Sequence, residues 1–301
     1  MRGEAMRYRV LRGGSYFSIT RDLLATLRYW DGPVDRDWYY GFRLVLPSPS
    51  PSPSPSPSPL SVQMKNHDKQ TKNHDKQNLI DLLRSDDRFD DAVDLLRSMD
   101  LSSDTVLGWL GFGLEIVSIP GGTGVVGEEG CRESVEFESF EMAATLTTVA
   151  QWAAIMGWLH TGTARRPVSV ADRTDRRPVV NVTAYEVDEF CRRLESIYGL
   201  DGGSVEVRLP HSAEWEYAAQ GGEKFTYAGS DDPDEVAWYA GNSGYKLQPV
   251  GQKKPNGYGL YDMSGNAYTW TCTSWDSDDT AGASAYRAAV STPKLRGGSH
   301  E

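Results

Sequence analysis

The side chains best suited to nucleophilic or metal chemistry are few and widely spaced in this chain. Its 301 residues include three cysteines, Cys131, Cys191 and Cys272, and none of them belongs to a CxxC pair. An odd cysteine count at wide spacing indicates neither a disulfide framework nor a zinc knuckle, and it fits a reducing cytoplasm. Cys191 follows Phe190 on a helical pattern, where a buried, inert thiol is expected. These residue types therefore predict no catalytic residue.

A second group of residues is suited to binding. Between Arg12 and Arg43 the sequence mixes aromatic side chains with Ser and Asp, which is the composition of a paratope, because rigid aromatics offer a large contact area at a small entropic cost. We expect a protein or small-molecule ligand to contact Tyr16, Phe17, Ser18, Ile19, Tyr29, Trp30, Asp31, Asp37, Trp38, Tyr39 and Tyr40. The alternative is that some of these aromatics, Tyr16 and Trp38 in particular, pack the core.

The elements that would position such residues are short and punctuated by glycine. Residues 114–143 contain runs of β type with the alternation of half-buried strands. Thr183 and Glu186 have the spacing of a helix-starting capping box. Helical patterns that each end at a glycine cover residues 145–158, 183–199 and 211–222. The sequence therefore predicts an α+β domain.

The chain divides by composition into four segments. They are residues 1–46, a linker of alternating Pro and Ser and a polar repeat at 47–77, a short helical module at 78–113, and the main domain at 114–301. The Pro/Ser stretch lacks half its backbone donors and favours an extended spacer. In the polar repeat, His67 and His74 have no other soft ligand near them, so metal binding there is disfavoured.

The helical module has a pattern of two short helices over residues 78–99. A helix pair this small needs a surface to pack on. We expect that surface to be the main domain, and the alternative is a helical partner from another protein.

The overall composition excludes several classes of partner. The formal net charge of −11 disfavours nucleic acid, whose affinity for proteins comes mostly from Lys and Arg. No run of 18 apolar residues is present, so no membrane span is expected, and the N-terminus lacks a signal-peptide core. We expect a cytoplasmic, globular protein with 39% apolar residues.

Three linked motifs resemble a known family. They read RPVVNVTAYEVDEFCRRL, VRLPHSAEWEYAAQGG and PVGQKKPNGYGLYDMSGNAYTW, over residues 177–270. In order and spacing they are similar to the central signature of the formylglycine-generating enzyme, or sulfatase-modifying factor, family. The resemblance implies that family's variant of the C-type lectin fold, in the α+β class. The aromatic segment also resembles the variable proteins of diversity-generating retroelements, many of which use this fold for binding.

The resemblance also implies a calcium loop. In the segment GLYDMSGNAYTW, a structural calcium ion would be held by Asp262 and by the carbonyls of Gly265 and Ala267. Thr269 stands where many relatives carry a carboxylate, which would weaken the site. The alternative is a turn without metal, held by hydrogen bonds of Asp262 and Asn266.

Copper chemistry is not expected. Active members of the family oxidise a sulfatase cysteine with a copper ion held by two cysteines shortly after a GGS(Y/W) element. The matching positions in this chain are Ser18 and Leu23, which cannot supply thiolates. The resemblance therefore favours a ligand-binding or display module. The alternative is a formylglycine-generating-type oxidoreductase or a non-heme metal enzyme with an unrecognised site.

The segments stand in an unusual order. Residues 9–45 resemble the stretch that closes the family's domain, but here they come first, whereas the C-terminus ends in KLRGGSHE with a second RGGS. We expect residues 1–46 to fold back and complete the core, which makes the domain circularly permuted. The alternative is that they are the tail of a neighbouring domain.

Overall fold

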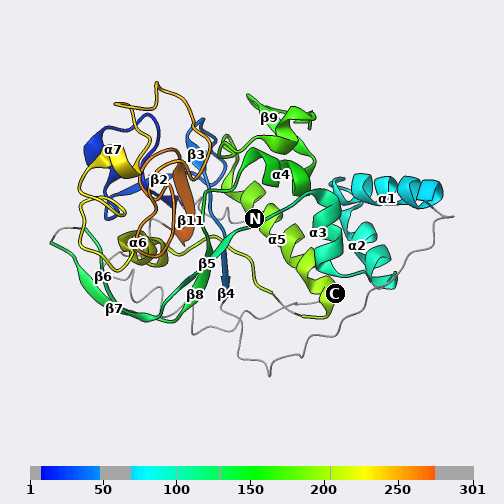
Figure 1. The fold of residues 1–301 in the computed structure, drawn as a ribbon, viewed down its shortest axis with the longest axis horizontal. Coiled ribbons are helices and arrows are strands. Elements are labelled where there is room, and N and C mark those ends of the chain that lie inside the picture. The colour runs from blue at the N-terminus through cyan, green and yellow to red at the C-terminus, as the bar shows by residue number, and fades with distance from the viewer. Residues whose placement is uncertain (1–7, 48–68, 100, 129, 204, 275–301) are drawn as a thin grey trace, which may run out of the picture.

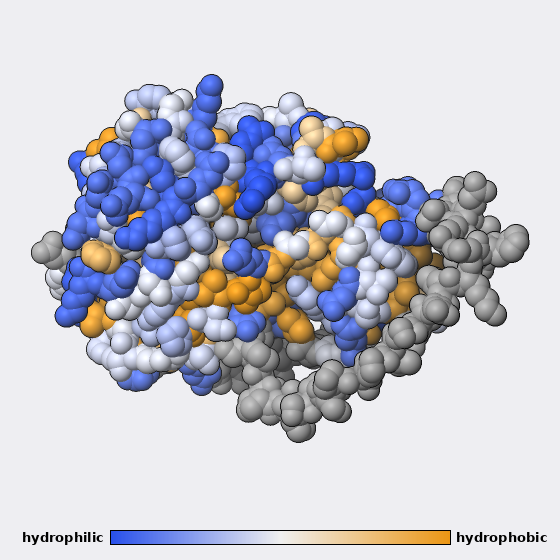
Figure 2. Space-filling model, viewed as in Figure 1, coloured by the Kyte–Doolittle hydropathy of each residue, from blue (hydrophilic) through white to orange (hydrophobic). Residues whose placement is uncertain are grey.

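The computed structural model describes residues 8–47, 69–99, 101–128, 130–203 and 205–274. Figure 1 shows most of the strands with α6 and α7 at one end of the molecule, and α1 to α5 with the β9 strand at the other. On the face seen in Figure 2, hydrophilic side chains dominate the end that carries the strands, and hydrophobic ones gather near the centre. The mixture of helix and sheet confirms the α+β class. Among the described residues, no helix combines the length and apolarity needed to cross a bilayer.

The central sheet joins the two ends of the described chain. Its strand order is β2 (Arg28–Asp31), β1 (Arg9–Arg12), β11 (Tyr268–Ser274) and β3 (Tyr40–Gly41). β1 is antiparallel to both neighbours, and β11 is parallel to β3. Only β11 comes from the main domain, so the N-terminal segment builds most of this sheet.

A second sheet has β8 (Phe140–Ala143) between β4 (Val45–Pro47) and β5 (Ile116–Ile119). Both neighbours are antiparallel to β8, with Val45 and Val117 opposite Met142. Two hairpins complete the strands: β6 (Gly122–Val126) with β7 (Glu133–Phe137), and β9 (Trp158–Thr161) with β10 (Ala164–Pro167). The strands predicted within residues 114–143 are thus confirmed.

The helices of the main domain begin and end where local signals predict. α4 (Val149–Met156), α5 (Ala184–Tyr198) and α6 (Ser212–Gln220) lie inside the three helical patterns, and α7 (Pro233–Val236) is an additional short helix. Thr183 and Glu186 form the predicted capping box. Short 3-10 helices are η1 (Thr20–Leu23), η2 (Ala171–Thr174) and η3 (Gly199–Asp201).

The helical module packs on the main domain. It consists of α1 (Lys69–Leu83), α2 (Phe89–Ser98) and α3 (Ser103–Leu110). Leu83 and Leu96 are buried in one core cluster with Trp152 and Phe190 of the main domain. α1 begins inside the stretch that the sequence assigns to the linker, and α3 was not predicted. The apolar side chains at helical spacing face the core, and only one of them, Leu95, is exposed; the set is Leu79, Ile80, Leu83, Val93, Leu95 and Leu96. A helical partner for residues 78–99 stays a prediction.

The N-terminal segment shares its core with the main domain. Leu11, Phe42 and Leu44 have no exposed surface, and burying each such side chain stabilises a fold by roughly 1.5–3 kcal/mol. Arg12 and Glu216 form a salt bridge of 2.9 Å with both side chains almost fully buried. In the described structure, residues 8–47 therefore pack as part of the domain and not as a separate tail. The second RGGS, at residues 296–299, and His67 lie outside the described residues.

Candidate ligand-binding surface

Three tyrosines meet where the strands of the central sheet pair. Tyr268 of β11 lies next to Tyr29 of β2, with ring centroids 5.6 Å apart, and next to Tyr39, at 6.1 Å. Tyr29 is 52% exposed, whereas Tyr268 is buried. Tyr268 was not predicted as a site residue, because its place depends on the register between β11 and β1, which no local pattern reveals.

The loop after β1 is fixed to the main domain at several points. The Ser18 hydroxyl donates to the Tyr268 hydroxyl at 3.3 Å and accepts from the Ser15 amide at 3.0 Å. The Tyr16 amide donates to the Asn266 carbonyl at 2.9 Å. Ser18 is buried, so it orients its neighbours and does not present a contact to a ligand. Burial also raises the pKa of Tyr268, which keeps its hydroxyl protonated.

Two exposed rings meet beside this fixed loop. Phe17 is 59% exposed and Tyr245 is 60% exposed, and their ring centroids lie 5.2 Å apart in an edge-to-face arrangement. Ile19 is exposed beside them in the sequence, and Tyr16 is half-buried. Tyr245, which takes a left-handed φ of 56°, was also missed by the sequence. Two segments far apart in the chain thus supply one apolar contact.

Acidic groups lie at the end of β2 and in the loop that follows it. The Tyr40 hydroxyl donates to Asp31 Oδ2 at 2.6 Å, and the Gly32 amide donates to Asp31 Oδ1 and to Asp35 Oδ2. Burial and then the hydrogen bond and charge of Asp31 raise the pKa of Tyr40. The hydrogen bond to Asp31 also raises the pKa of Asp35, since two carboxyl groups share this corner. Tyr40 is buried and supports the surface from inside.

The loop before β3 presents the largest exposed ring. Asp37 Oδ1 accepts from the Trp38 amide at 2.7 Å, and the Asp37 carbonyl accepts from the Asn181 amide at 2.9 Å. Trp38 itself is 58% exposed, so it does not pack the core. Tyr39 is half-buried, and burial, followed by its hydrogen bond to Asp37, raises its pKa to about 12.

One predicted residue is separated from the others. Successive side chains of a strand point to opposite faces, so Trp30 of β2 lies on the face opposite Tyr29. Its ring packs edge-on against Tyr8, with centroids 4.5 Å apart. We define the aromatic surface as the exposed or half-buried apolar and aromatic residues described above without Trp30; they are Phe17, Ile19, Tyr29, Trp38, Tyr39 and Tyr245.

The turn predicted to hold calcium is hydrogen-bonded to itself and to its neighbours. Asp262 Oδ2 accepts from the Gly251 amide at 2.9 Å, and Asp262 Oδ1 accepts weakly from Asn266 Nδ2 at 3.4 Å. The Gly265 amide donates to the Gly13 carbonyl at 2.7 Å. Burial raises the pKa of Asp262, although the charge of Arg43 opposes this.

These contacts fit a hydrogen-bonded turn better than a cation cage, because both Asp262 oxygens already accept hydrogen bonds and the Arg43 charge is close. The described residues contain no cluster of three or more His, Cys, Asp or Glu side chains that could hold a metal ion. Calcium at Asp262, Gly265 and Ala267 stays a prediction, which thermal unfolding with added calcium or a chelator would test.

The positions that correspond to the copper ligands lie in packed surroundings. Leu23 is buried against Val236 and Ala237, and Ser18 is buried as described. The cysteines lie elsewhere. Cys131 is exposed and Cys191 is buried, whereas Cys272 Sγ lies 3.1 Å from His211 Nδ1.

Burial raises the pKa of both inner thiols, that of Cys272 to about 12. A thiol with such a pKa stays protonated at neutral pH and is a poor nucleophile and metal ligand. The Cys272–His211 contact was not predicted, since the two residues are far apart in the sequence.

An α+β fold that presents exposed aromatic side chains from loops on a packed sheet defines a class of domain suited to recognition. A family model described as the "Sulfatase-modifying factor enzyme 1-like domain" matches residues 113–301. The chain belongs to this family, which supports its C-type-lectin-like fold.

The chain is 34% identical over 193 residues to the chaperone protein LppX of Paenibacillus barcinonensis, an alignment that covers 48% of this chain and 65% of that protein. It is 35% identical over 118 residues to the formylglycine-generating enzyme of Mycobacterium tuberculosis, covering 31% of this chain and 40% of that protein. It thus spans less than two thirds of either relative. Among solved structures, Treponema denticola variable protein 1 is 25% identical, with a TM-score of 0.39, over 50% of this chain and 69% of that one.

Proposed function

We propose that this chain is a binding module that holds a protein or small-molecule ligand on the aromatic surface and does not oxidise cysteine. The observation that carries the proposal is the exposure of Phe17, Trp38 and Tyr245, each more than half exposed, on a backbone that is itself fixed by hydrogen bonds. Large apolar side chains held rigidly in solvent lose little entropy on binding.

The neighbouring groups give this surface a mixed character. Asp31 ends β2, Asp35 and Asp37 lie in the loop that follows, and the hydroxyls of Tyr40 and Tyr39 are hydrogen-bonded to Asp31 and Asp37. Such a surface can bury an apolar group of a ligand and accept hydrogen bonds from its donors. Ser18 and Leu23 stand at the positions of the copper ligands, and neither side chain can supply a thiolate. This supports binding over copper-dependent oxidation.

The proposal includes the circular permutation. The aromatic surface takes Phe17, Tyr29 and Trp38 from the N-terminal segment and Tyr245 from the main domain, with Tyr268 beneath. β1 lies between β2 and β11, and its backbone pairs with both. In related sequences the segment that closes the domain comes at the other end of the chain, and it would supply the strand that corresponds to β1.

A selection experiment tests the binding surface. We would select peptides from a display library on the wild-type chain and measure the dissociation constant of the enriched peptide. Truncation of a central aromatic contact commonly costs more than about 1 kcal/mol, so Phe17→Ala combined with Trp38→Ala should weaken binding about tenfold or more. Phe225→Ala, which removes another exposed ring, is the matched control and should bind normally.

Enriched peptides that bind the double variant as tightly as the wild type would overturn the assignment of the surface. The catalytic alternative has its own test. A cysteine-containing sulfatase peptide incubated with the chain and copper should form no aldehyde, and aldehyde formation would contradict a purely binding role.

A further inference from the structure

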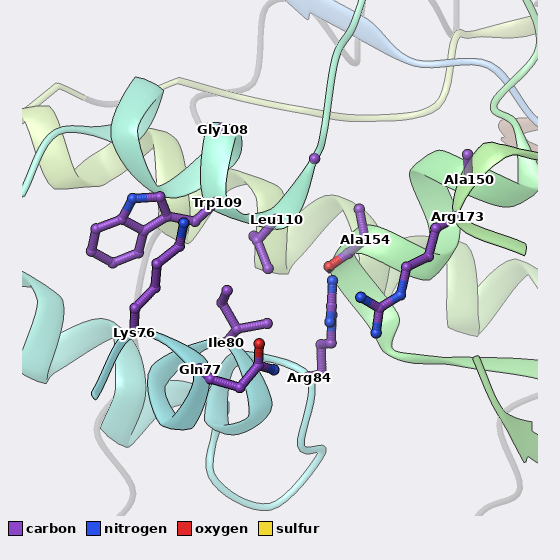
Figure 3. Close-up of a pocket in the computed structure, with 11 residues that line it drawn as sticks. Lys76, Gln77, Ile80, Arg84, Gly108, Trp109, Leu110, Ala150, Ala154 and Arg173 are labelled. Atoms are coloured by element: carbon purple, nitrogen blue, oxygen red, sulfur yellow. Dashed lines mark hydrogen bonds between the residues drawn. The ribbon is translucent and has the colours of Figure 1, made fainter. Parts of the chain in front are cut away.

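A pocket lies between the helical module and the main domain. It has a volume of about 320 Å³, and its walls come from α1 and α3 on one side and from α4 and η2 on the other. The lining residues include Ile80 and Leu110, which give it an apolar floor. Figure 3 shows the Trp109 ring beside the Lys76 side chain at one end, with Arg84 and Arg173 at the other.

The charge of this pocket is opposite to that of the chain. Lys76, Arg84 and Arg173 line it, and no carboxylate is among its described lining residues, although the chain carries a net charge of −11. Within the described part of the chain, none of the three cations forms a salt bridge. Arg84 Nε donates only to the Ala154 carbonyl, at 3.3 Å.

Both guanidinium groups line one end of the pocket, so their like charges act on each other across it. Burial and then the charge of Arg173 lower the pKa of Arg84, while Asp81 opposes this. Two like charges in one pocket repel each other, and an anion bound between them reduces this repulsion. Their planar donors match the oxygens of a carboxylate or phosphate group, which accept two parallel hydrogen bonds.

We infer that this pocket binds a small organic anion, whose phosphate or carboxylate group lies between Arg84 and Arg173. Lys76 Nζ lies over the Trp109 ring at 5.4 Å from its centroid, so the far end of the pocket combines a flat apolar face with a further cation. A volume of about 320 Å³ is at the lower end of the range for small-molecule sites, which excludes a macromolecule from the interior.

Because of the position of the pocket, a bound ligand should stabilise the fold. Because Arg84 directly follows α1 and Arg173 lies in η2, an anion between them attaches the helical module to the main domain. A ligand that binds only the folded chain raises its stability in proportion to the logarithm of its concentration above the dissociation constant. Binding should therefore raise the thermal midpoint and weaken as salt screens the charges.

Calorimetry and thermal unfolding of the full chain test the inference, with inorganic phosphate, benzoate and adenosine monophosphate as probes at low salt. We expect saturable binding, tightest for the probe whose flat body reaches Trp109. Binding of phosphate alone would assign a simple oxyanion site, and binding of benzoate alone a carboxylate site. Arg173→Gln, at an exposed position, should keep the fold and weaken binding at least tenfold, and Arg84→Gln should do the same.

Arg132→Gln removes one exposed positive charge from the β6–β7 hairpin and is the matched control, which should leave binding unchanged. Two results would overturn the inference. One is no saturable binding of any of the three probes at millimolar concentration. The other is equal weakening by Arg132→Gln and Arg173→Gln, which would indicate only a general effect of net charge.

Discussion

Arg12 connects the N-terminal segment to the main domain through buried hydrogen bonds. Its Nη2 donates to Glu216 Oε2 at 2.9 Å, its Nε donates to the Ser212 hydroxyl at 2.8 Å, and its Nη1 donates to the carbonyls of Ala25 and Thr26. Every part of this buried guanidinium is thus hydrogen-bonded, which is the condition under which a buried charge is tolerated.

Replacing Arg12 should therefore be costly. In Arg12→Ala, the Glu216 carboxylate stays buried without its counterion, and we expect a loss of about 3–5 kcal/mol in the free energy of unfolding, measured by urea denaturation. Arg9→Ala on the same strand removes the partly exposed salt bridge to Asp188 and should cost about 1 kcal/mol or less. Equal losses of unfolding free energy in both variants would mean that the contact of Arg12 stabilises the fold no more than the surface contact of Arg9 does.

The three thiols should differ in reactivity. Cys131 is exposed, whereas burial raises the pKa of Cys191 and Cys272, the latter to about 12. Thiol reagents attack the thiolate, so at pH 8 one thiol of the native chain should react quickly and the other two only after denaturation. Cys131→Ser should abolish the fast phase. Fast labelling of Cys272 in that variant would mean that its contact with His211 activates it.

At the scale of elements, the helix α5 depends on a capping carboxylate that also binds the N-terminal segment. Glu186 Oε2 accepts from the Thr183 amide at 3.0 Å, and the two Glu186 oxygens accept from Arg36 at 2.6 and 2.9 Å. Burial alone would raise the pKa of Glu186, but the hydrogen bonds of Arg36 and Thr183 outweigh it and lower the pKa to about 2.

The lowered pKa of Glu186 makes the stability of the fold fall at acid pH. A carboxyl group whose folded pKa lies below its ordinary value of 4.5 stabilises the fold above pH 4.5, and the stabilisation is lost as the pH falls toward about 2. Glu186→Gln should be less stable by about 2 kcal/mol at pH 7 and should lose less stability on acidification. Asp188→Asn, an exposed change on the same helix, should follow the wild-type pH curve in urea unfolding.

The same elements show what the sequence can and cannot predict. The boundaries of α5 follow from Thr183, Glu186 and Gly199, which act over one helical turn. The pairing of β1 with β11 joins Leu11 to Trp270, and such a contact depends on the whole chain. Of the site residues, Phe17 and Trp38 were predicted from composition, whereas Tyr245 and Tyr268 were missed because only the tertiary fold brings them close.

Side chains alternate between the two faces of a strand, so the sequence would have placed Trp30 and Tyr29 on opposite faces if β2 had been predicted. It was not, because RYWD is too short and too mixed to have a clear period of two. α3 escaped prediction for a similar reason: Ser103–Leu110 is a short helix whose apolar residues are buried only because it packs against α5 and η3.

At the scale of the whole molecule, the N-terminal segment and the main domain share one core, although 21 residues between them, 48–68, are outside the described structure. Leu11, Phe42 and Leu44 are fully buried, and release of the segment would expose all three to water. It would also leave one edge of β8 and both edges of β11 without their partner strands. These costs should hold the segment in place even when the chain is cut.

Cleavage at a protease site introduced in the Pro/Ser stretch tests this directly. Native mass spectrometry of the cut protein should find the N-terminal fragment still bound to the remainder, because the contacts that hold it do not depend on the linker. Combining the cut with Arg12→Ala should promote release, since Glu216 then opposes rebinding, whereas the cut with Arg9→Ala should leave the complex intact. Spontaneous release from the wild-type chain would mean that the segment does not close the domain, and the aromatic surface would lose Phe17, Tyr29 and Trp38.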